Sequence, residues 1–344
     1  MKVAFIMPTY FDPSSVIAGG ERYAYELAKA VSEKADTTIF TFSENPEKNI
    51  KDGKLNVRYC KTLFHAGGIA NPFSVTHLMG LHNFDVVHCL QFKTLVTETA
   101  ILLGALQKKK VFVTDLAGGT YYCLSHFFPT EKCVTEFLFI SDYNRSLHGH
   151  LHQPSRIIYG GVDQDFFKPG AAPKSGRKIL YVGRIFKLKG LHVLIEALPE
   201  NGELEIVGQC HDSDYLANLK KMADGKKIRF YDSLPDSVVL EKYQQAAMTV
   251  LPSLVDGGFT SAMESMSCET PVIGTRFGSL PEVVEDGVTG WIVPPDDVPA
   301  LRAKIEFLLS DPEKAAAMGK RGRQAVLQHF TWGGVAQRCL EAYK

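Results

Sequence analysis

Short apolar runs alternate with helical patterns along almost the whole chain, and this alternation constrains the fold more than any other feature. In the first half the strand-like runs are KVAFIMP, DTTIFTF, DVVHCL, KVFVTDL and EFLFISD. Between the first two, ERYAYELAKAV places Ala24, Leu27, Ala28 and Val31 at the spacing of a helix with one apolar face. Strands that alternate with helices are typical of a parallel sheet covered on both faces. The sequence therefore predicts a doubly wound α/β fold.

The second half starts the same pattern again with KILYVGR, LEIVGQ, KIRFYD, MTVLPS and TPVIGT. A chain of 344 residues is also longer than one ordinary core needs, which favours two domains. Between the halves lies DQDFFKPGAAPKSGRK, rich in proline, glycine and small residues. We predict domains over residues 1–170 and 177–329. The segment 330–344 is predicted to be a helix that packs either on its own domain or back on the first.

Composition excludes several classes of protein. The chain is 45% hydrophobic and 22% charged, as in globular proteins, and its 38 basic residues equal its 38 acidic ones, which argues against a nucleic-acid partner. The seven cysteines contain no CxxC pair, so neither a zinc site nor a disulfide framework is expected, and a reducing cytoplasm is the predicted location. No apolar run approaches the roughly 20 residues that cross a bilayer. The cluster 108–110 is either a solvated turn or a patch for lipid headgroups at the inner face of a membrane.

Two glycine-containing stretches follow predicted strands. Gly19 and Gly20 directly precede the helix that opens with Glu21, and the free N–H groups of such a helix end attract phosphate. A plain tight turn is the alternative. Gly183 ends the first strand of the second half, and Arg184 and Lys189 follow it. A guanidinium and an ammonium suit the oxygens of a diphosphate, whereas the alternative for the lysine is an ordinary surface position.

The stretch VDGGFTSAMESM, residues 255–266, follows the strand-like run MTVLPS. Its glycine loop can point backbone N–H groups at a ligand rich in acceptors. Asp256 lies before the loop, and Glu264 lies on the helix after it, where a carboxylate can accept hydrogen bonds from the vicinal hydroxyls of a ribose. The alternative for Glu264 is an acid that complements the helix dipole. Two DxD pairs, at 163–165 and 212–214, lack a further acid or histidine and do not indicate a metal site.

Together these stretches resemble the retaining nucleotide-sugar glycosyltransferases of the GT-B fold, in particular family 4 of the bacterial and archaeal enzymes. The resemblance runs through AGGERYAYELAKAV, ISDYNRSL, IIYGGVDQDFF, YVGRIFKLKGLHVLIEAL and the stretch from VLPSLVDGG to GWIVPPDD, in that order. It implies two Rossmann-like domains that face a central cleft, with the acceptor held mainly by the first and the donor by the second.

The resemblance also implies a reaction. A hexosyl unit moves, with retention, from a nucleotide diphosphate sugar to a hydroxyl of a glycan, a lipid-linked acceptor or a small molecule. UDP is the favoured nucleotide, GDP is the alternative, and no metal or other cofactor is expected. The alternatives to a transferase are a nucleotide-sugar epimerase or phosphorylase of the same fold, and a catalytically impaired nucleotide-binding homologue.

By the same resemblance, Arg184 and Lys189 act on the donor diphosphate and Glu264 holds the ribose. Asp256 takes the place of an acid near the transferred sugar, where the family usually has glutamate followed by proline, phenylalanine and glycine. The implied contacts to the donor are Gly19, Gly20, Gly183, Gly257, Gly258, Phe259, Thr260 and Ser261.

The first half departs from the family at TDLAGGT, residues 114–120. The family commonly has a histidine near the end of this strand, close to the reaction centre, and this chain has none there. Asp115 or His126 is the candidate to replace it. His88 is a further candidate for contact with the acceptor or the sugar.

Overall fold

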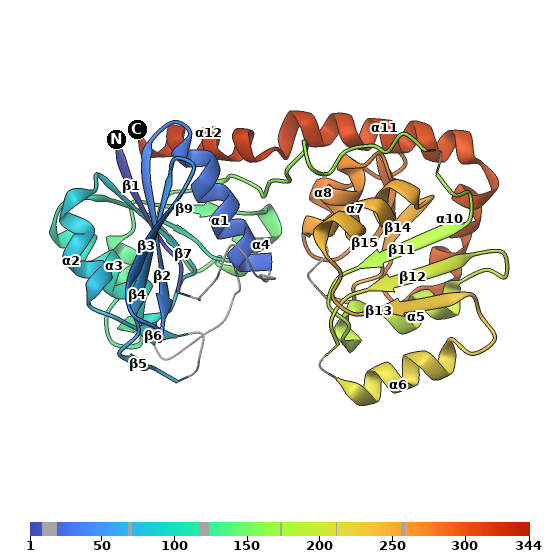
Figure 1. Ribbon diagram of the computed structural model, residues 1–344, viewed down its shortest axis with the longest axis horizontal. Helices are drawn as coiled ribbons and strands as arrows, with labels where there is room; N and C mark the ends of the chain where they lie inside the picture. Colours follow the sequence, from blue (N-terminus) through green and yellow to red (C-terminus); the bar gives the residue numbers. More distant parts are fainter. Residues whose placement is uncertain (9–18, 68–70, 117–123, 173, 211, 256–258) are drawn as a thin grey trace. The chain divides into compact units, whose positions relative to one another are not determined.

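The computed structural model describes residues 1–8, 19–67, 71–116, 124–172, 174–210, 212–255 and 259–344. These residues form two compact units (Figure 1). Unit 1 consists of Met1–Gly161 and Trp332–Lys344, and unit 2 consists of Val162–Thr331. Each unit has its own sheet with helices packed on it, as the alternation of apolar runs and helical patterns predicts.

Unit 1 is built on a sheet of eight described strands in the order β10-β9-β8-β7-β1-β2-β4-β3. The described pairings are parallel apart from the antiparallel hairpin β3–β4. The strands are β1 Lys2–Ile6, β2 Asp36–Ser43, β3 Lys48–Asp52, β4 Leu55–Lys61, β7 Val86–Leu90, β8 Lys110–Thr114, β9 Glu136–Phe139 and β10 Ser155–Ile157. A small second sheet pairs β5 Phe64–His65 with β6 Pro72–Phe73. Winding changes direction between β1 and β7, which is where ligands bind in such sheets.

Two apolar clusters cover the two faces of this sheet. One contains α1 and α12, and the other contains α3. The predicted stripe of Ala24, Leu27, Ala28 and Val31 is buried in the first cluster, which confirms the helix over this segment. The helices of unit 1 are α1 Gly19–Ser32, α2 Thr76–Gly80, α3 Leu95–Leu106, α4 Asp142–Leu147 and α12 Trp332–Tyr343, with 3₁₀ turns at Leu81–Asn83 (η1), Leu124–His126 (η2) and Thr130–Cys133 (η3).

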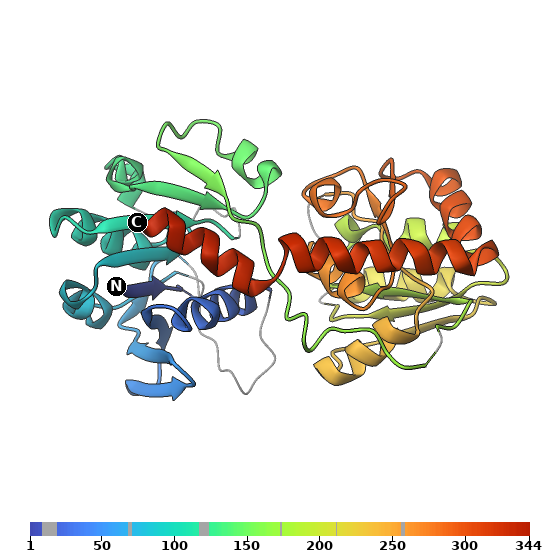
Figure 2. The same cartoon turned by 90° about the horizontal axis from the view of Figure 1, so that it is seen from above.

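The terminal helix α12 lies beside α1 in unit 1 (Figure 2). Val335, Cys339 and Tyr343 form its buried stripe. At its start, Gly161 lies so close to Trp332 that a Cβ atom on Gly161 would be 2.6 Å from the indole ring. The end of the chain therefore returns to the first domain, which is one of the two positions that the sequence leaves open.

Unit 2 contains a parallel sheet of six described strands in the order β13-β12-β11-β14-β15-β16. Its strands are β11 Lys178–Val182, β12 Glu203–Val207, β13 Ile228–Tyr231, β14 Met248–Leu251, β15 Val272–Thr275 and β16 Gly290–Val293. Its helices are α5 Leu191–Ala197, α6 Ser213–Met222, α7 Asp236–Gln245, α8 Phe259–Ser267, α9 Leu280–Val283, α10 Val298–Ser310 and α11 Pro312–His329, with a 3₁₀ turn at Lys187–Lys189 (η4). Across the described part of the chain, no helix is long and apolar enough to cross a membrane.

Unit 2 begins directly after Gly161, whereas the composition of the chain predicts the domain boundary at 169–176. The intervening segment packs on unit 2 despite its proline and glycine content. Phe167 is buried, and its carbonyl accepts a hydrogen bond of 2.5 Å from Ser267 Oγ. Lys174 Nζ donates to the carbonyls of Tyr243 and Cys268 at 3.3 and 3.1 Å. Burial lowers the pKa of Lys174 to about 8. These contacts depend on residues distant in sequence, so composition alone does not reveal them.

His88 links the sheet of unit 1 to α12. The side chain is fully buried in β7, its Nδ1 lies 2.6 Å from the Tyr343 hydroxyl, and its Nε2 lies 2.8 Å from Thr114 Oγ1. Burial lowers the pKa of His88 to about 3. In the unfolded chain the same imidazole has a pKa of about 6.5. Between these values the unfolded state binds a proton that the folded state does not, so stability falls as the pH falls.

We therefore expect His88→Gln to reduce the loss of stability below pH 6.5. Each buried neutral histidine can contribute up to about 1.4 kcal/mol per pH unit to this loss. Urea unfolding at pH 6.5 and pH 5 measures it, and the wild type should lose about 1.6 kcal/mol more than the variant between these conditions. The exposed His152→Gln serves as the control and should behave as the wild type does. The same pH dependence in all three proteins would contradict the assignment.

Candidate functional site

The sequence-predicted donor residues of unit 2 cluster around the adjacent strands β11 and β14. The chain leaves β11 toward β12 on one side, and it enters β14 and continues to β15 on the other. The winding therefore changes direction between these two strands, and ligands bind beyond the carboxyl ends of strands at such a point. Arg184 and Lys189 follow β11, while Glu264 lies on α8, the helix after β14.

Glycines allow the loops at this edge to approach closely. Gly208, after β12, has a φ of +155°, and a Cβ atom there would lie 1.9 Å from the Gly183 carbonyl oxygen. Gly183 has the same φ, and the next residue, Arg184, accepts a hydrogen bond of 2.8 Å at its carbonyl from the Tyr181 hydroxyl. The backbone at Arg184 is therefore fixed by the Tyr181 hydroxyl and by close backbone packing that leaves no room for a side chain at Gly208.

A second close approach joins the loops after β11 and β14. Gly190 has a φ of +68°, and a Cβ atom there would lie 2.0 Å from the Pro252 carbonyl oxygen. Nearby, the Leu254 N–H donates to the Leu188 carbonyl at 2.8 Å. The segment that carries Lys189 is thus held directly against the chain that leads into the VDGG stretch.

Phe186 lies close to both predicted cations. Its ring centroid is 5.3 Å from Arg184 Cζ and 5.5 Å from Lys189 Nζ. The electron-rich face of an aromatic ring attracts cations, which offsets part of the repulsion between two positive charges placed close together. Arg184 is exposed, and its guanidinium forms no hydrogen bond or ion pair with another described residue, while Lys189 is 8% exposed. The pair therefore offers one open guanidinium and one buried ammonium to an anion.

Glu264 is a buried carboxylate with a fixed orientation. It is 6% exposed, and its Oε2 accepts a hydrogen bond of 3.0 Å from the Tyr243 hydroxyl on α7. Burial raises the pKa of Tyr243 well above its usual range, and the nearby Glu264 charge adds to this shift. A buried carboxylate needs such partners because desolvation is costly. The burial of Glu264 and its hydrogen bond to Tyr243 fit a positioned carboxylate better than the alternative, a surface acid that complements the helix dipole.

The remaining predicted donor residues of unit 2 belong to the stretch 256–261. Phe259, Thr260 and Ser261 form its first turn, where backbone N–H groups have no partner within the helix. Asp256, Gly257 and Gly258 lie outside the described residues. One acid of each DxD pair forms a hydrogen bond to the nearby backbone. Asp163 Oδ1 accepts from the N–H of Asp165 at 3.0 Å, and Asp212 caps α6.

In unit 1, Gly19 and Gly20 begin α1, and a Cβ atom on either would have no neighbour within 4 Å. Asp115 follows β8 and is 3% exposed. Its Oδ1 accepts from the Phe92 N–H at 3.1 Å, and its Oδ2 lies 3.0 Å from His148 Nε2. The sequence does not indicate His148, because it lies far from Asp115 along the chain.

The two histidines predicted to contact the acceptor or sugar lie in different environments. His126 is exposed at the end of η2. That turn is held by the buried Glu98, whose carboxylate accepts from the Ser125 N–H and, at 3.0 Å, from Thr130 Oγ1. His88 has no exposed surface and uses both ring nitrogens. Contact between His88 and a sugar would require these hydrogen bonds to open.

Residues 162–325 match the family model of the glycosyl transferases group 1. The chain is 30% identical, over 59% of its length, to the GDP-mannose-dependent alpha-(1-6)-phosphatidylinositol monomannoside mannosyltransferase of Mycolicibacterium smegmatis. The match covers 60% of that protein, and other curated relatives are covered over 54–55% of their length. The chain thus spans little more than half of these relatives.

Solved structures share the fold over the whole chain. The sucrose-phosphate synthase of Thermosynechococcus elongatus has a TM-score of 0.76 and 20% identity, with 99% of this chain and 98% of the other covered. Anabaena HepE in complex with UDP and glucose has a TM-score of 0.73 and 18% identity, with 99% of both chains covered. The predicted GT-B fold of two Rossmann-like domains is thereby confirmed.

Gly190→Ala should disrupt the loop that carries Lys189. Gly225→Ala is a matched control, because Gly225 has a φ of +71° but no neighbour within 4 Å of a Cβ atom. The control should lose about 1–2 kcal/mol of stability from the backbone conformation alone. We expect Gly190→Ala to lose clearly more in urea unfolding, since the Pro252 carbonyl must also move. Equal losses would show that the close approach does not constrain the loop.

Proposed function

We propose that this protein is a retaining glycosyltransferase, a member of family 4 that transfers a hexosyl unit from a nucleotide diphosphate sugar to an acceptor hydroxyl. The observation that carries this proposal is the placement of Arg184 and Lys189 on one aromatic ring, Phe186, at the strand edge where the winding changes direction. Two cations at such an edge suit a diphosphate.

Glu264 supports a nucleotide as the carrier of that diphosphate. A carboxylate whose Oε2 is held by Tyr243 keeps its orientation, and an oriented carboxylate can accept hydrogen bonds from two vicinal ribose hydroxyls. We favour UDP, with GDP as the alternative. One solved relative is described in complex with UDP and glucose, and one curated relative is named for its dependence on GDP-mannose.

In the proposed reaction the bond between the anomeric carbon and the diphosphate breaks, and a bond from that carbon to the acceptor oxygen forms on the same face. The acceptor proton passes to the departing diphosphate. Arg184 and Lys189 stabilise the negative charge that grows on the leaving group, an effect that commonly dominates catalysis of this kind. We assign Asp256 to the transferred sugar, and Asp115 or His126 to the acceptor side.

We further propose that the reaction needs no metal ion and takes place in the cytoplasm, at the inner face of the membrane when the acceptor is lipid-linked. The acceptor class is a glycan, a lipid-linked saccharide or a small molecule. Incubation with UDP-sugars and GDP-sugars, with and without acceptors, tests the proposal. Isomerised sugar formed without acceptor would identify an epimerase instead, and nucleotide binding without turnover would identify an impaired homologue.

Arg184→Ala and Lys189→Ala should each lower turnover by about 10²–10³, as the loss of one stabilising contact to a growing charge does in other enzymes. The control is Lys187→Ala, which removes an exposed lysine from the same 3₁₀ turn and should keep turnover within about twofold. Circular dichroism confirms folding. Full activity in both test variants would contradict the assignment of Arg184 and Lys189 to the leaving diphosphate.

Glu264→Gln should weaken binding of the nucleoside diphosphate by about tenfold or more, since a charge-assisted hydrogen bond to the ribose is lost. Tyr243→Phe should weaken it less, because the carboxylate remains and loses only one positioning contact. Calorimetric titration with UDP and GDP measures both. Glu306→Gln, an exposed acid on α10, is the control.

Asp256→Asn completes this comparison. We expect it to lower turnover while nucleotide affinity stays near the wild-type value, because Asp256 is assigned to the sugar and Glu264 to the ribose. An equal loss of nucleotide affinity in Asp256→Asn and Glu264→Gln would mean that these roles are divided wrongly.

A further inference from the structure

Unit 1 contains a groove of about 410 Å³ that involves none of the candidate site residues. Strands β2, β4 and β3 form its floor, and residues from the stretch 80–84 form one wall. Since this stretch precedes β7, and the groove residues of β4 lie among the first four residues of that strand, the groove lies toward the amino ends of the strands. It is therefore separate from the carboxyl edge where ligands of doubly wound sheets bind. We refer to it as the β2–β4–β3 groove.

The pairing register places six polar or aromatic side chains side by side on the floor. Residues paired across strands share a face, and so do residues two apart along a strand. The first row of the floor is Thr38, Asn56 and Lys51, and the second row is Phe40, Arg58 and Asn49. The alternate positions Leu55, Val57 and Tyr59 of β4 are buried on the other face. The groove is thus the polar face of a sheet edge that α3 does not cover.

Arg58 is held in a defined position on this floor. Its guanidinium carbon lies 5.8 Å from the centroid of the Phe40 ring, which in turn packs edge-on against Phe84 at 5.7 Å. Gly80 lies close by, so that a Cβ atom there would be 3.3 Å from Arg58 Nη1. An arginine stacked on an aromatic ring keeps its donors in one plane, which favours binding of a carboxylate or phosphate.

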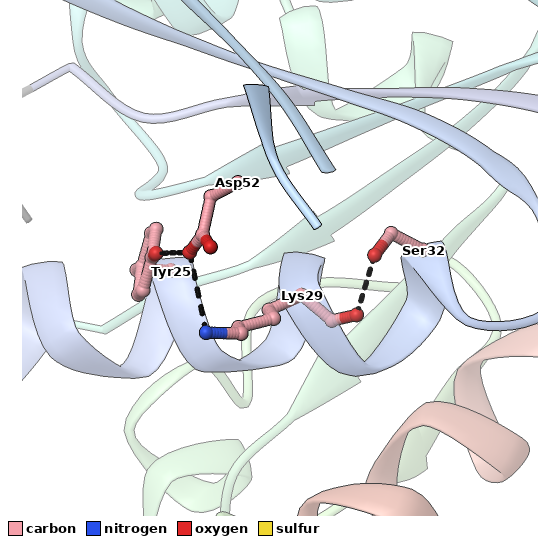
Figure 3. A network of polar contacts seen from close by, with 4 residues as sticks. All are labelled: Tyr25, Lys29, Ser32 and Asp52. Carbon is pink, nitrogen blue, oxygen red and sulfur yellow. Dashed lines mark hydrogen bonds and ion pairs between the residues drawn. The ribbon is translucent and has the colours of Figure 1, made fainter. Parts of the chain in front are cut away.

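The charge of the groove is positive and uncompensated. Lys51 and Arg58 line it, none of the lining residues is acidic, and the charged group of neither side chain forms a hydrogen bond or ion pair with another described residue. The neighbouring Asp52 is turned to the other face of β3. There its Oδ2 accepts from the Tyr25 hydroxyl and lies 3.2 Å from Lys29 Nζ, both on α1 (Figure 3). This contact anchors the β3–β4 hairpin and leaves Lys51 unneutralised.

We propose that the β2–β4–β3 groove binds a saccharide that carries a carboxylate or phosphate group. Arg58 and Lys51 bind the anionic group. The side chains of Asn49, Asn56 and Thr38 supply donors and acceptors for sugar hydroxyls. The partly exposed Phe84 offers an apolar surface to a sugar ring. The groove volume lies within the range of small-molecule sites, roughly 300–1,000 Å³. This site would hold an acidic sugar on unit 1 independently of the transferase reaction, so the proposal does not rest on that function.

Titration of the whole 344-residue chain with four probes, followed by calorimetry or NMR, tests the proposal. Glucose 6-phosphate carries a phosphate and glucuronate a carboxylate, and the sugar that binds with the lower Kd identifies which anionic group the groove prefers. We expect at least one to bind with a Kd of about 1 mM or below, and both glucose and inorganic phosphate to bind about tenfold more weakly than that ligand. Absence of saturable binding by both acidic sugars would overturn the proposal. If inorganic phosphate binds as tightly as glucose 6-phosphate, the groove recognises only the anion and not the sugar, and this result would also overturn the proposal.

Variants locate the binding. Arg58→Gln should weaken binding of the acidic sugar by about tenfold or more, because a bidentate charge-assisted contact is lost. Lys54→Gln, on the same hairpin, removes an equal charge from a surface pair with Glu33 at 2.8 Å and should change affinity less than about twofold. Because Arg58 also covers Phe40, Asn49→Ala on the exposed strand β3 is the second test variant, and it should weaken binding severalfold. Unchanged binding in Asn49→Ala and Arg58→Gln would place the sugar elsewhere and contradict the proposal.

Discussion

The candidate donor site depends on the close packing of backbone against backbone at the edge between β11 and β14. Gly190 lies against the Pro252 carbonyl, and Gly208 lies against the Gly183 carbonyl, at distances that leave no space for a Cβ atom. These approaches place the segment 184–189 against the chain that leads to the VDGG stretch. The two cations, the ring of Phe186 and the helix that carries Glu264 therefore come from neighbouring strands of one rigid sheet, as binding sites of doubly wound folds do.

Much of this arrangement can be predicted from the sequence because it depends on local pattern. The apolar runs identify β1, β2, β7, β8 and β9 in unit 1 and β11–β15 in unit 2, but they miss β3, β4, β10 and β16. The position of Arg184 directly after a strand places it at a carboxyl edge. The partners cannot be predicted in this way. Tyr243 precedes Glu264 by a whole strand and loop, so the sequence does not indicate their hydrogen bond. Nothing in the sequence marks Phe186 as the ring that both cations contact. The boundary after Gly161 also depends on distant contacts, those of Phe167 with Ser267.

In unit 1 the partners of His88 cannot be predicted from the sequence, whereas the polar face of the groove can be predicted in part. A histidine within an apolar strand carries no mark of its neighbours, and only the packing of α12 shows that His88 bonds to Tyr343. The groove has a clearer origin in the sequence, since β4 alternates buried Leu55, Val57 and Tyr59 with half-buried Asn56 and Arg58. Alternation predicts a polar face, but the register with β2 and β3 is needed to show which side chains share it.

The central claim is that unit 2 recognises a nucleoside diphosphate through its two cations. The most direct measurement is the shift in melting temperature with UDP and GDP compared with uridine and guanosine, because a ligand that binds the folded state raises its apparent stability in proportion to its affinity. The account predicts a clear rise with at least one diphosphate and a much smaller rise with the matching nucleoside. Equal shifts with the diphosphate and its nucleoside, or no shift with any of the four, would contradict it.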